Sequence, residues 1–148
     1  MTERAGGCLC GAVRFTVRGE PRLVGHCHCG DCRKSSGAGH VSFAFYRETD
    51  LAVRGQSASH DVKSDGGGTM TRLFCPACGG RLFARSSRRP GVIGVVLGAF
   101  DEPASFVPSV SLFVSRAQPW DTVAAGTARF DANFGPPPGG SENGAPTA

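Results

Sequence analysis

The sequence predicts a mainly β protein, because strand-like patterns recur along it and no window shows a long amphipathic helix. Over residues 12–18, hydrophobic side chains alternate with polar ones, as in a strand with one buried face. Val41, Phe43 and Phe45 repeat this alternation. That register places Ala44 on the other face, away from the core that the aromatic residues would form.

Four further segments complete the expected fold. Residues 91–100 are rich in Val and Gly and are typical of a fully buried strand. Every second residue over 110–114 is hydrophobic, which predicts one face of a later strand. Residues 65–68 indicate a loop or hairpin. A short helical turn is expected over residues 31–36.

A chain of 148 residues is expected to form one domain, which we place at residues 1–130. Residues 131–148 are rich in Pro, Gly and small polar side chains, so they cannot bury enough apolar surface to offset the entropy of ordering, and we expect disorder. The net charge of +4 comes from 16 basic and 12 acidic side chains. This mild excess is compatible with anionic small molecules or weak nucleic-acid contact and establishes neither.

The sequence predicts a soluble cytoplasmic protein with no membrane contact. Residues 1–7 are polar and charged and do not resemble a signal peptide. The longest apolar run, residues 91–100, is far shorter than the ~20 residues that span a bilayer. In a reducing compartment, closely spaced cysteines are more often metal ligands or redox thiols than structural disulfides.

The cysteines are the most informative residues, because there are seven of them in three clusters. An odd number excludes complete disulfide pairing within one chain. Seven cysteines can be divided into four and three. Four thiolates close a tetrahedral structural zinc site, whereas three leave one coordination position open, as a catalytic zinc requires. The sequence therefore predicts two zinc ions with different roles.

We assign Cys8, Cys10, Cys75 and Cys78 to the structural zinc. In an extended chain, residues two apart point to the same side, so Cys8 and Cys10 can reach one metal. Cys75 and Cys78 have the spacing of a zinc-ribbon-like knuckle, and the two glycines after them allow a tight turn.

We assign Cys27, Cys29 and Cys32 to the catalytic zinc, which could be labile, with the fourth position left for water or substrate. His26 and His28 are expected not to bind this metal, since an extended chain turns His28 away from its neighbours. Two other interpretations of the thiols remain open, namely small buried residues and redox-active dithiols.

Three segments, residues 7–15, 27–37 and 74–80, carry these motifs in an order that resembles the glutathione-dependent formaldehyde-activating enzyme and centromere protein V family. Weaker matches follow at residues 97–103 and 118–120. The resemblance implies a zinc-binding β-tent domain of coiled antiparallel sheets. It also implies the same division of the cysteines between a structural and a second zinc.

The activity that the resemblance implies is that of a carbon–sulfur lyase acting on a thiol–aldehyde adduct such as S-hydroxymethylglutathione. The sequence departs from the family pattern at Ser111, where many members carry His. If that His contributes to catalysis or substrate contact, this chain acts on a different substrate.

The substrate is expected to be a small thiol or its aldehyde adduct, bound beside the third cysteine of the catalytic site. Arg33 and Lys34 could meet the carboxylates of a glutathione-like thiol, and Ser35 and Ser36 could donate hydrogen bonds to it. The alternative for the two basic residues is a solvated surface. Trp120 is expected to anchor the core.

The competing interpretation is a non-enzymatic zinc module that binds nucleic acid or protein. Its basic surface would be formed by Arg81, Arg85, Arg88 and Arg89. We expect no nucleic-acid partner, because exposed aromatic residues are not interleaved with the basic ones. An exposed strand edge would permit a homodimer.

Overall fold

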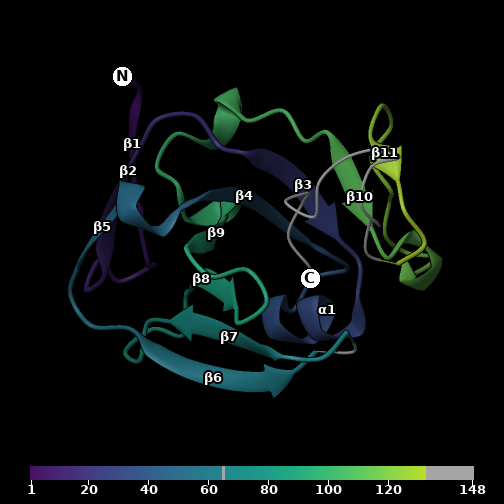
Figure 1. The fold of residues 1–148 in the computed structure, drawn as a ribbon, viewed down its shortest axis with the longest axis horizontal. Coiled ribbons are helices and arrows are strands. Elements are labelled where there is room, and N and C mark those ends of the chain that lie inside the picture. Colours follow the sequence, from purple (N-terminus) through teal and green to yellow (C-terminus); the bar gives the residue numbers. More distant parts are fainter. Residues whose placement is uncertain (65, 133–148) are drawn as a thin grey trace.

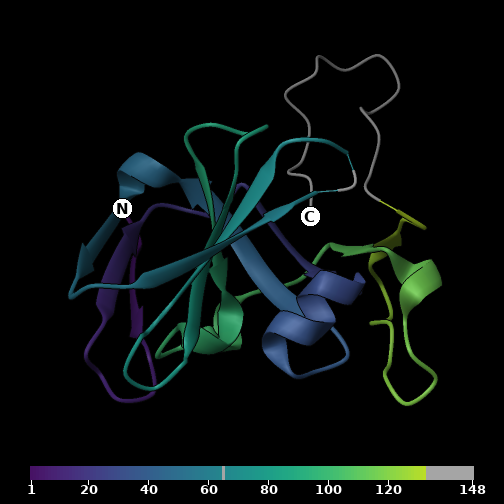
Figure 2. The same cartoon turned by 90° about the horizontal axis from the view of Figure 1, so that it is seen from below.

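The computed structural model describes residues 1–64 and 66–132, and it confirms the mainly β class (Figure 1). Two sheets are present in these residues, one of three strands and one of eight. The larger sheet curls from β10 and β11 at one end to β6 and β7 at the other, with the smaller sheet to one side (Figures 1 and 2). The predicted disordered tail falls almost wholly on residues 133–148, outside the described residues.

Short strands are the main regular elements of the described chain. The strands are β1 (Glu3–Gly7), β2 (Arg14–Arg18), β3 (Leu23–Cys27), β4 (Val41–Arg47), β5 (Leu51–Arg54), β6 (Ala58–Lys63), β7 (Thr69–Phe74), β8 (Arg81–Ser86), β9 (Val92–Val96), β10 (Val110–Leu112) and β11 (Ala128–Arg129). The helical segments are α1 (Gly30–Ser36) and the 3-10 turns η1 (Glu48–Asp50), η2 (Leu97–Ala99), η3 (Pro103–Ser105) and η4 (Val114–Arg116). No helix of the described chain combines the length and the apolar character needed to cross a lipid bilayer.

The smaller sheet has the antiparallel order β1-β2-β5. Its predicted alternation is confirmed in β2, where Phe15 and Val17 are buried. The Phe15 ring packs edge-on against Phe83 and Phe100, with centroids 5.3 and 5.2 Å away. These contacts join the smaller sheet to the larger one through a shared aromatic core.

The larger sheet has the order β11-β10-β3-β4-β9-β8-β7-β6. Its strands pair antiparallel except at one end, where β10 runs parallel to both β3 and β11. The coiled antiparallel arrangement that we expected therefore holds for most of the sheet, with β10 as the exception.

Strand β4 lies between two separate hydrophobic cores, which corrects the prediction for Ala44. Ala44 and Tyr46 are buried in the core beneath the smaller sheet. Val41 and Phe43 point to the other face, into a second core. Both faces of β4 are thus covered, and the hydrophobic pattern of the strand follows from two cores instead of one.

Two predicted strands are shorter than expected. Only the first half of residues 91–100 is a strand, because β9 ends at Val96 and the chain turns into η2. The later strand ends at Leu112, so Val114 does not belong to it. Phe113 causes this end, since its left-handed backbone angle (φ 54°) is incompatible with a strand.

The predicted helical turn is confirmed as α1, one residue longer than expected. Cys29 caps its first turn by accepting a hydrogen bond from the backbone N–H of Cys32. Gly37 ends the helix in the left-handed conformation, and its N–H bonds the carbonyl of Arg33. The helix cap is therefore formed by one of the cysteines assigned to the second zinc.

Candidate functional site

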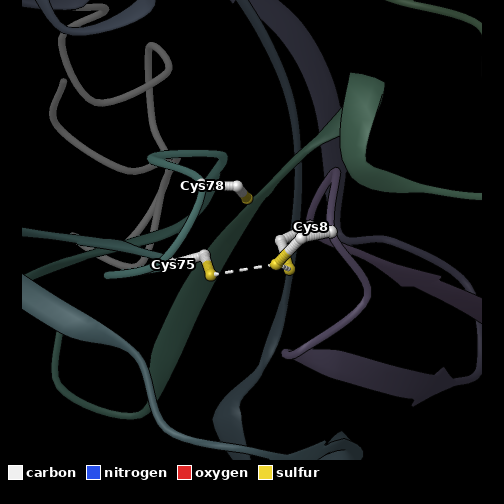
Figure 3. A group of neighbouring side chains, drawn as sticks. Cys8, Cys75 and Cys78 are labelled. Carbon is white, nitrogen blue, oxygen red and sulfur yellow. Dashed lines mark hydrogen bonds between the residues drawn. The ribbon is translucent and has the colours of Figure 1, made fainter.

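The fold brings together Cys8, Cys10, Cys75 and Cys78, named here the four-thiol group. Figure 3 shows Cys8 facing Cys75 and Cys78 across the space between two turns. The Sγ atom of Cys10 lies 3.7 Å from those of both Cys8 and Cys75. All four sulfurs lie within 4.8 Å of one another, so they could hold one metal ion.

Two glycine-containing turns position these sulfurs. After β7, the backbone N–H groups of Cys75 and Gly79 bond the carbonyls of Gly80 and Cys75, and Gly79 adopts a positive φ of 74°. After β1, the N–H of Cys8 bonds the carbonyl of Val13 at 3.0 Å. The two turns belong to different sheets, so this group joins the sheets at one point.

The thiols of this group do not ionise independently. The hydrogen bond from the Val13 backbone N–H, with smaller contributions from the neighbouring thiols, lowers the pKa of Cys8 to about 6. The Ala12 N–H lowers the pKa of Cys10, but the Cys8 thiol and partial desolvation outweigh it and raise this pKa to about 11. Such opposite shifts are expected where several thiolates share one site, as metal ligands do.

Cys27, Cys29 and Cys32 form a second group, named here the three-thiol group. Their sulfurs lie within 4.8 Å of one another and all three side chains are buried. Cys27 ends β3 and Cys32 lies in the first turn of α1, so one strand end and one helix start place all three. They belong to the second hydrophobic core, with Phe43 and Leu112.

Within this group, Cys32 is the thiol poised to ionise. Its pKa is lowered well below the usual value by hydrogen bonds with Cys27 and Cys29, against desolvation by burial, and further by the charges of Arg81 and Arg72. Those same thiol contacts raise the pKa of Cys27. The two arginines therefore supply positive charge to a buried thiolate.

A cavity of about 50 Å³ adjoins the three-thiol group. Much of its lining is apolar, but two of the thiols and four arginines also line it. We name it the arginine pocket after these arginines. These residues are Cys27, Cys32, Arg72, Arg81, Arg85 and Arg89. Such a site favours a small anionic or polarised group next to the sulfurs.

A wider groove of about 670 Å³ lies alongside and shares Arg81 and Val41 with the arginine pocket. We name it the serine groove, because Ser35, Ser36 and Ser42 line it. The Nη1 atom of Arg81 donates a hydrogen bond to Ser35 Oγ at 2.7 Å, which joins the two spaces.

The substrate contacts predicted from the sequence divide into two pairs. Ser35 and Ser36 line the serine groove, as a substrate contact requires. Arg33 and Lys34 are not among the residues that line either space. Trp120 is 69% exposed, so the prediction that it anchors the core is wrong.

Most arginines of the basic cluster considered for nucleic-acid binding line the arginine pocket or bond other groups of the protein. Arg81, Arg85 and Arg89 line the arginine pocket. Arg85 also pairs with Glu48 at 2.9 Å, and the Arg88 guanidinium bonds the carbonyl of Gly66. Arg72 was missed by the sequence analysis, because a lone Arg in a strand gives no sign that it will be buried.

Histidine side chains gather on the other side of β3. His28 lies with His40 and Asp121, apart from the thiols, as the extended-chain geometry predicted. The His26 ring packs edge-on against His40, with centroids 4.9 Å apart. Burial, together with the nearby His40 and His28, lowers the pKa of His26 to about 4. His40 and Asp121 were missed, since 81 residues separate them in the chain.

Ser111, where many relatives are expected to carry His, is fully buried in β10 directly beside His26 of β3. Its Oγ atom shares a hydrogen bond with Thr127 Oγ1 at 2.7 Å. The hydroxyl therefore has a structural partner within the protein.

Comparisons with known proteins agree with this arrangement. The family model of the glutathione-dependent formaldehyde-activating enzyme matches residues 3–116. A curated protein of Halomonas elongata, named "Putative glutathione-dependent formaldehyde-activating enzyme", is 29% identical over 121 residues, covering 78% of this chain and 77% of that protein. A crystal structure of a Rhodobacter sphaeroides protein shares the fold, with a TM-score of 0.55 and 24% identity over 70% of this chain and 97% of that one. The match over most of the chain, including all seven cysteines, shows that this protein belongs to the glutathione-dependent formaldehyde-activating enzyme family.

Proposed function

We propose that the protein is a carbon–sulfur lyase-type enzyme that interconverts a thiol and formaldehyde with their S-hydroxymethyl adduct, with glutathione as the thiol. The observation that carries this proposal is the three-thiol group, which offers three buried ligands and opens onto the arginine pocket. Family membership supports the substrate pair. A cytoplasmic location and a homodimer stay predictions from the sequence.

The four-thiol group fits a structural zinc ion. A zinc–sulfur bond of about 2.3 Å places the sulfurs of a tetrahedral site about 3.8 Å apart. The Cys8–Cys10 and Cys10–Cys75 distances of 3.7 Å match this edge. We infer that this ion fastens the smaller sheet to the larger one and takes no part in the reaction.

The three-thiol group fits a second zinc ion with a free coordination position. Zinc held by Cys27, Cys29 and Cys32 would supply a place where a substrate thiol is held as thiolate near neutral pH. Three ligands that are buried and belong to one strand end and one helix turn are held rigidly by the second core. Cys27 and Cys32 also line the arginine pocket, so a substrate in that pocket would lie beside these two ligands.

The reaction needs only an addition and a proton transfer. The substrate thiol first gives its proton to solvent. The thiolate sulfur then attacks the carbonyl carbon of formaldehyde, a carbon–sulfur bond forms, and the carbonyl π electrons move to oxygen, which takes a proton from solvent. Arg72 and Arg81 line the arginine pocket and lower the pKa of Cys32, and we propose that they also stabilise negative charge on the substrate sulfur and on the developing oxygen anion. Cleavage of the adduct is the reverse of these steps.

We further propose that Arg81 and the serine groove bind the rest of the thiol substrate. The arginine pocket is too small for a tripeptide, whereas the adjoining groove of about 670 Å³ is large enough. Arg81 lies at their junction and, with Ser35 and Ser36, could meet a substrate carboxylate. Arg33 and Lys34, which lie in α1 with the two serines, remain proposed outer contacts.

The test measures kcat/KM of an Arg81→Gln variant. Arg54→Gln is the matched control, because Arg54 is an exposed arginine of β5. Loss of one charge-assisted contact should lower kcat/KM for glutathione with formaldehyde about tenfold or more. With 2-mercaptoethanol, a thiol that has no carboxylate, the Arg81→Gln loss should be smaller.

Arg54→Gln should match the wild type with both thiols. Equal losses with both thiols would contradict a carboxylate contact by Arg81 while leaving the reaction in place. No adduct formation by the wild-type protein with any small thiol would overturn the proposed function and raise the non-enzymatic alternative.

A further inference from the structure

His28, His40 and Asp121 form a compact group outside both sets of thiols, named here the histidine cluster. Asp121 Oδ2 lies 2.8 Å from His40 Nδ1 and 3.4 Å from His28 Nδ1. One potential ligand atom of each residue lies within 4.8 Å of those of the other two. One carboxylate oxygen therefore faces two imidazole nitrogens.

The backbone holds the three side chains from three different segments. His28 follows β3, and its N–H bonds the carbonyl of Leu112 at 2.9 Å. His40 immediately precedes β4, while Asp121 comes from the loop after η4. Gly39 leaves room for the carboxylate, because a Cβ there would lie 2.3 Å from Asp121 Oδ2.

The buried imidazole ring of His28 lacks hydrogen-bond partners in the described part of the chain. Its side chain is 0% exposed, and among the described residues neither of its ring nitrogens has a hydrogen-bond partner. A buried polar side chain without a partner costs about 1–3 kcal/mol, so such groups are rare unless a ligand engages them. Its Nδ1 lies 3.4 Å from Asp121 Oδ2, which is longer than an ordinary hydrogen bond.

We propose that the histidine cluster is a third metal site, which binds a divalent transition-metal ion through two imidazoles and one carboxylate. This donor set is typical of Zn²⁺ and of Fe²⁺, Co²⁺ or Ni²⁺, and differs from the all-sulfur sites. Bonds of about 2.0–2.1 Å place tetrahedral ligands about 3.3 Å apart. The 3.4 Å separation already meets this value, and the 2.8 Å one needs to widen by about 0.5 Å.

The surroundings allow an ion to enter and support its ligands. His40 lines the serine groove, so the cluster adjoins an open space. His26 packs against His40 but does not belong to the group whose ligand atoms could share one ion, and its Nδ1 is hydrogen-bonded with Ser42 Oγ at 2.9 Å. Ser42 and His26 thereby fix the position of the His40 ring.

The direct test measures zinc per chain in His40→Ala and Asp121→Ala proteins purified without chelator, with folding checked by circular dichroism. His60→Ala is the matched control, because His60 is exposed on β6. Each cluster variant should hold one ion fewer than the wild type and the control. Wild-type metal content in both folded cluster variants would overturn the proposal.

A second measurement needs no variant. Co²⁺ added to protein whose thiol sites are filled with zinc should give visible d–d bands without the near-ultraviolet sulfur-to-cobalt charge transfer of thiolate sites. Absence of any such band would contradict the third site. Neither experiment depends on catalysis, so failure of the proposed enzyme activity leaves this inference untouched.

Discussion

At the scale of single residues, the distinctive feature is the pair of arginine side chains, Arg72 and Arg81, whose positive charges act on the buried Cys32 thiol. Arg72 is buried, and burial lowers the pKa of Arg81 even though the Cys32 charge opposes this. Among the described residues the Nε atoms of both arginines lack hydrogen-bond partners. Buried cations without full pairing are costly, so this arrangement is expected where an anion is to be bound.

A second ionic contact, between Arg14 and Asp101, predicts a pH effect. The hydrogen bond from the Arg14 guanidinium lowers the pKa of Asp101 below its ordinary value of 3.8. The unfolded chain then binds more protons in this range, so the contact stabilises the fold above about pH 4, and that stabilisation is lost as pH falls through the lowered pKa. Asp101→Asn should therefore make the melting temperature slightly less sensitive to acid.

Thermal melts between about pH 2 and 5 measure this, with Glu102→Gln, another exposed acidic residue, as the control. The effect should be small because both side chains are partly exposed to solvent. An Asp101→Asn protein with the same acid dependence as the wild type would show that the contact contributes nothing in solution.

Residue spacing could locate the thiol groups, because their ligands are close in sequence or lie in recognisable turns. The histidine cluster could not be located in this way, since Asp121 reaches His40 only through the folded chain. The pairing of Arg72 with Cys32 likewise depends on how β7 and α1 approach each other. Trp120 misled the prediction because its large ring usually favours burial.

At the scale of elements, β4 connects the candidate active site to the rest of the fold. Its Phe43 side chain is 7% exposed and lies in the core that contains the three-thiol group. The ring also packs edge-on against Phe45, with centroids 4.6 Å apart. A cavity created at Phe43 would therefore weaken the packing around the three-thiol group.

Phe43→Ala should lower the free energy of unfolding by about 3–5 kcal/mol, since it removes a buried aromatic ring. Urea unfolding measures this, with Val53→Ala on β5 as the control because Val53 is 45% exposed. The control should change stability by no more than about 0.5 kcal/mol. A Phe43→Ala loss below about 1 kcal/mol would contradict a well-packed core behind the thiols.

The elements that the sequence predicted well are those governed by local pattern. The alternation of β2 and the short helical turn at α1 are local signals. The ends of β9 and β10 were misjudged, because a left-handed Phe113 and the turn at η2 are imposed by tertiary contacts that hydrophobic periodicity does not record. The parallel pairing of β10 is non-local for the same reason.

At the scale of the whole molecule, the two thiol groups lie at two different cores. The four-thiol group adjoins the core shared by the two sheets, and the three-thiol group belongs to the core on the other face of β4. This separation is compatible with the two roles that we propose, a structural one for the four-thiol group and a catalytic one for the three-thiol group. Sequence spacing alone predicted the division of the cysteines into two groups. That the two groups lie at different hydrophobic cores could be seen only in the folded structure.

The most direct test of this division is the zinc content and activity of Cys32→Ser beside those of the wild type. We predict a folded protein that has lost one zinc ion per chain and no longer forms the adduct of glutathione and formaldehyde. Cys75→Ser, its counterpart in the other group, should instead lower the melting temperature. A Cys32→Ser protein that lacks one zinc yet works at the full rate would contradict the assignment of the three-thiol group to catalysis.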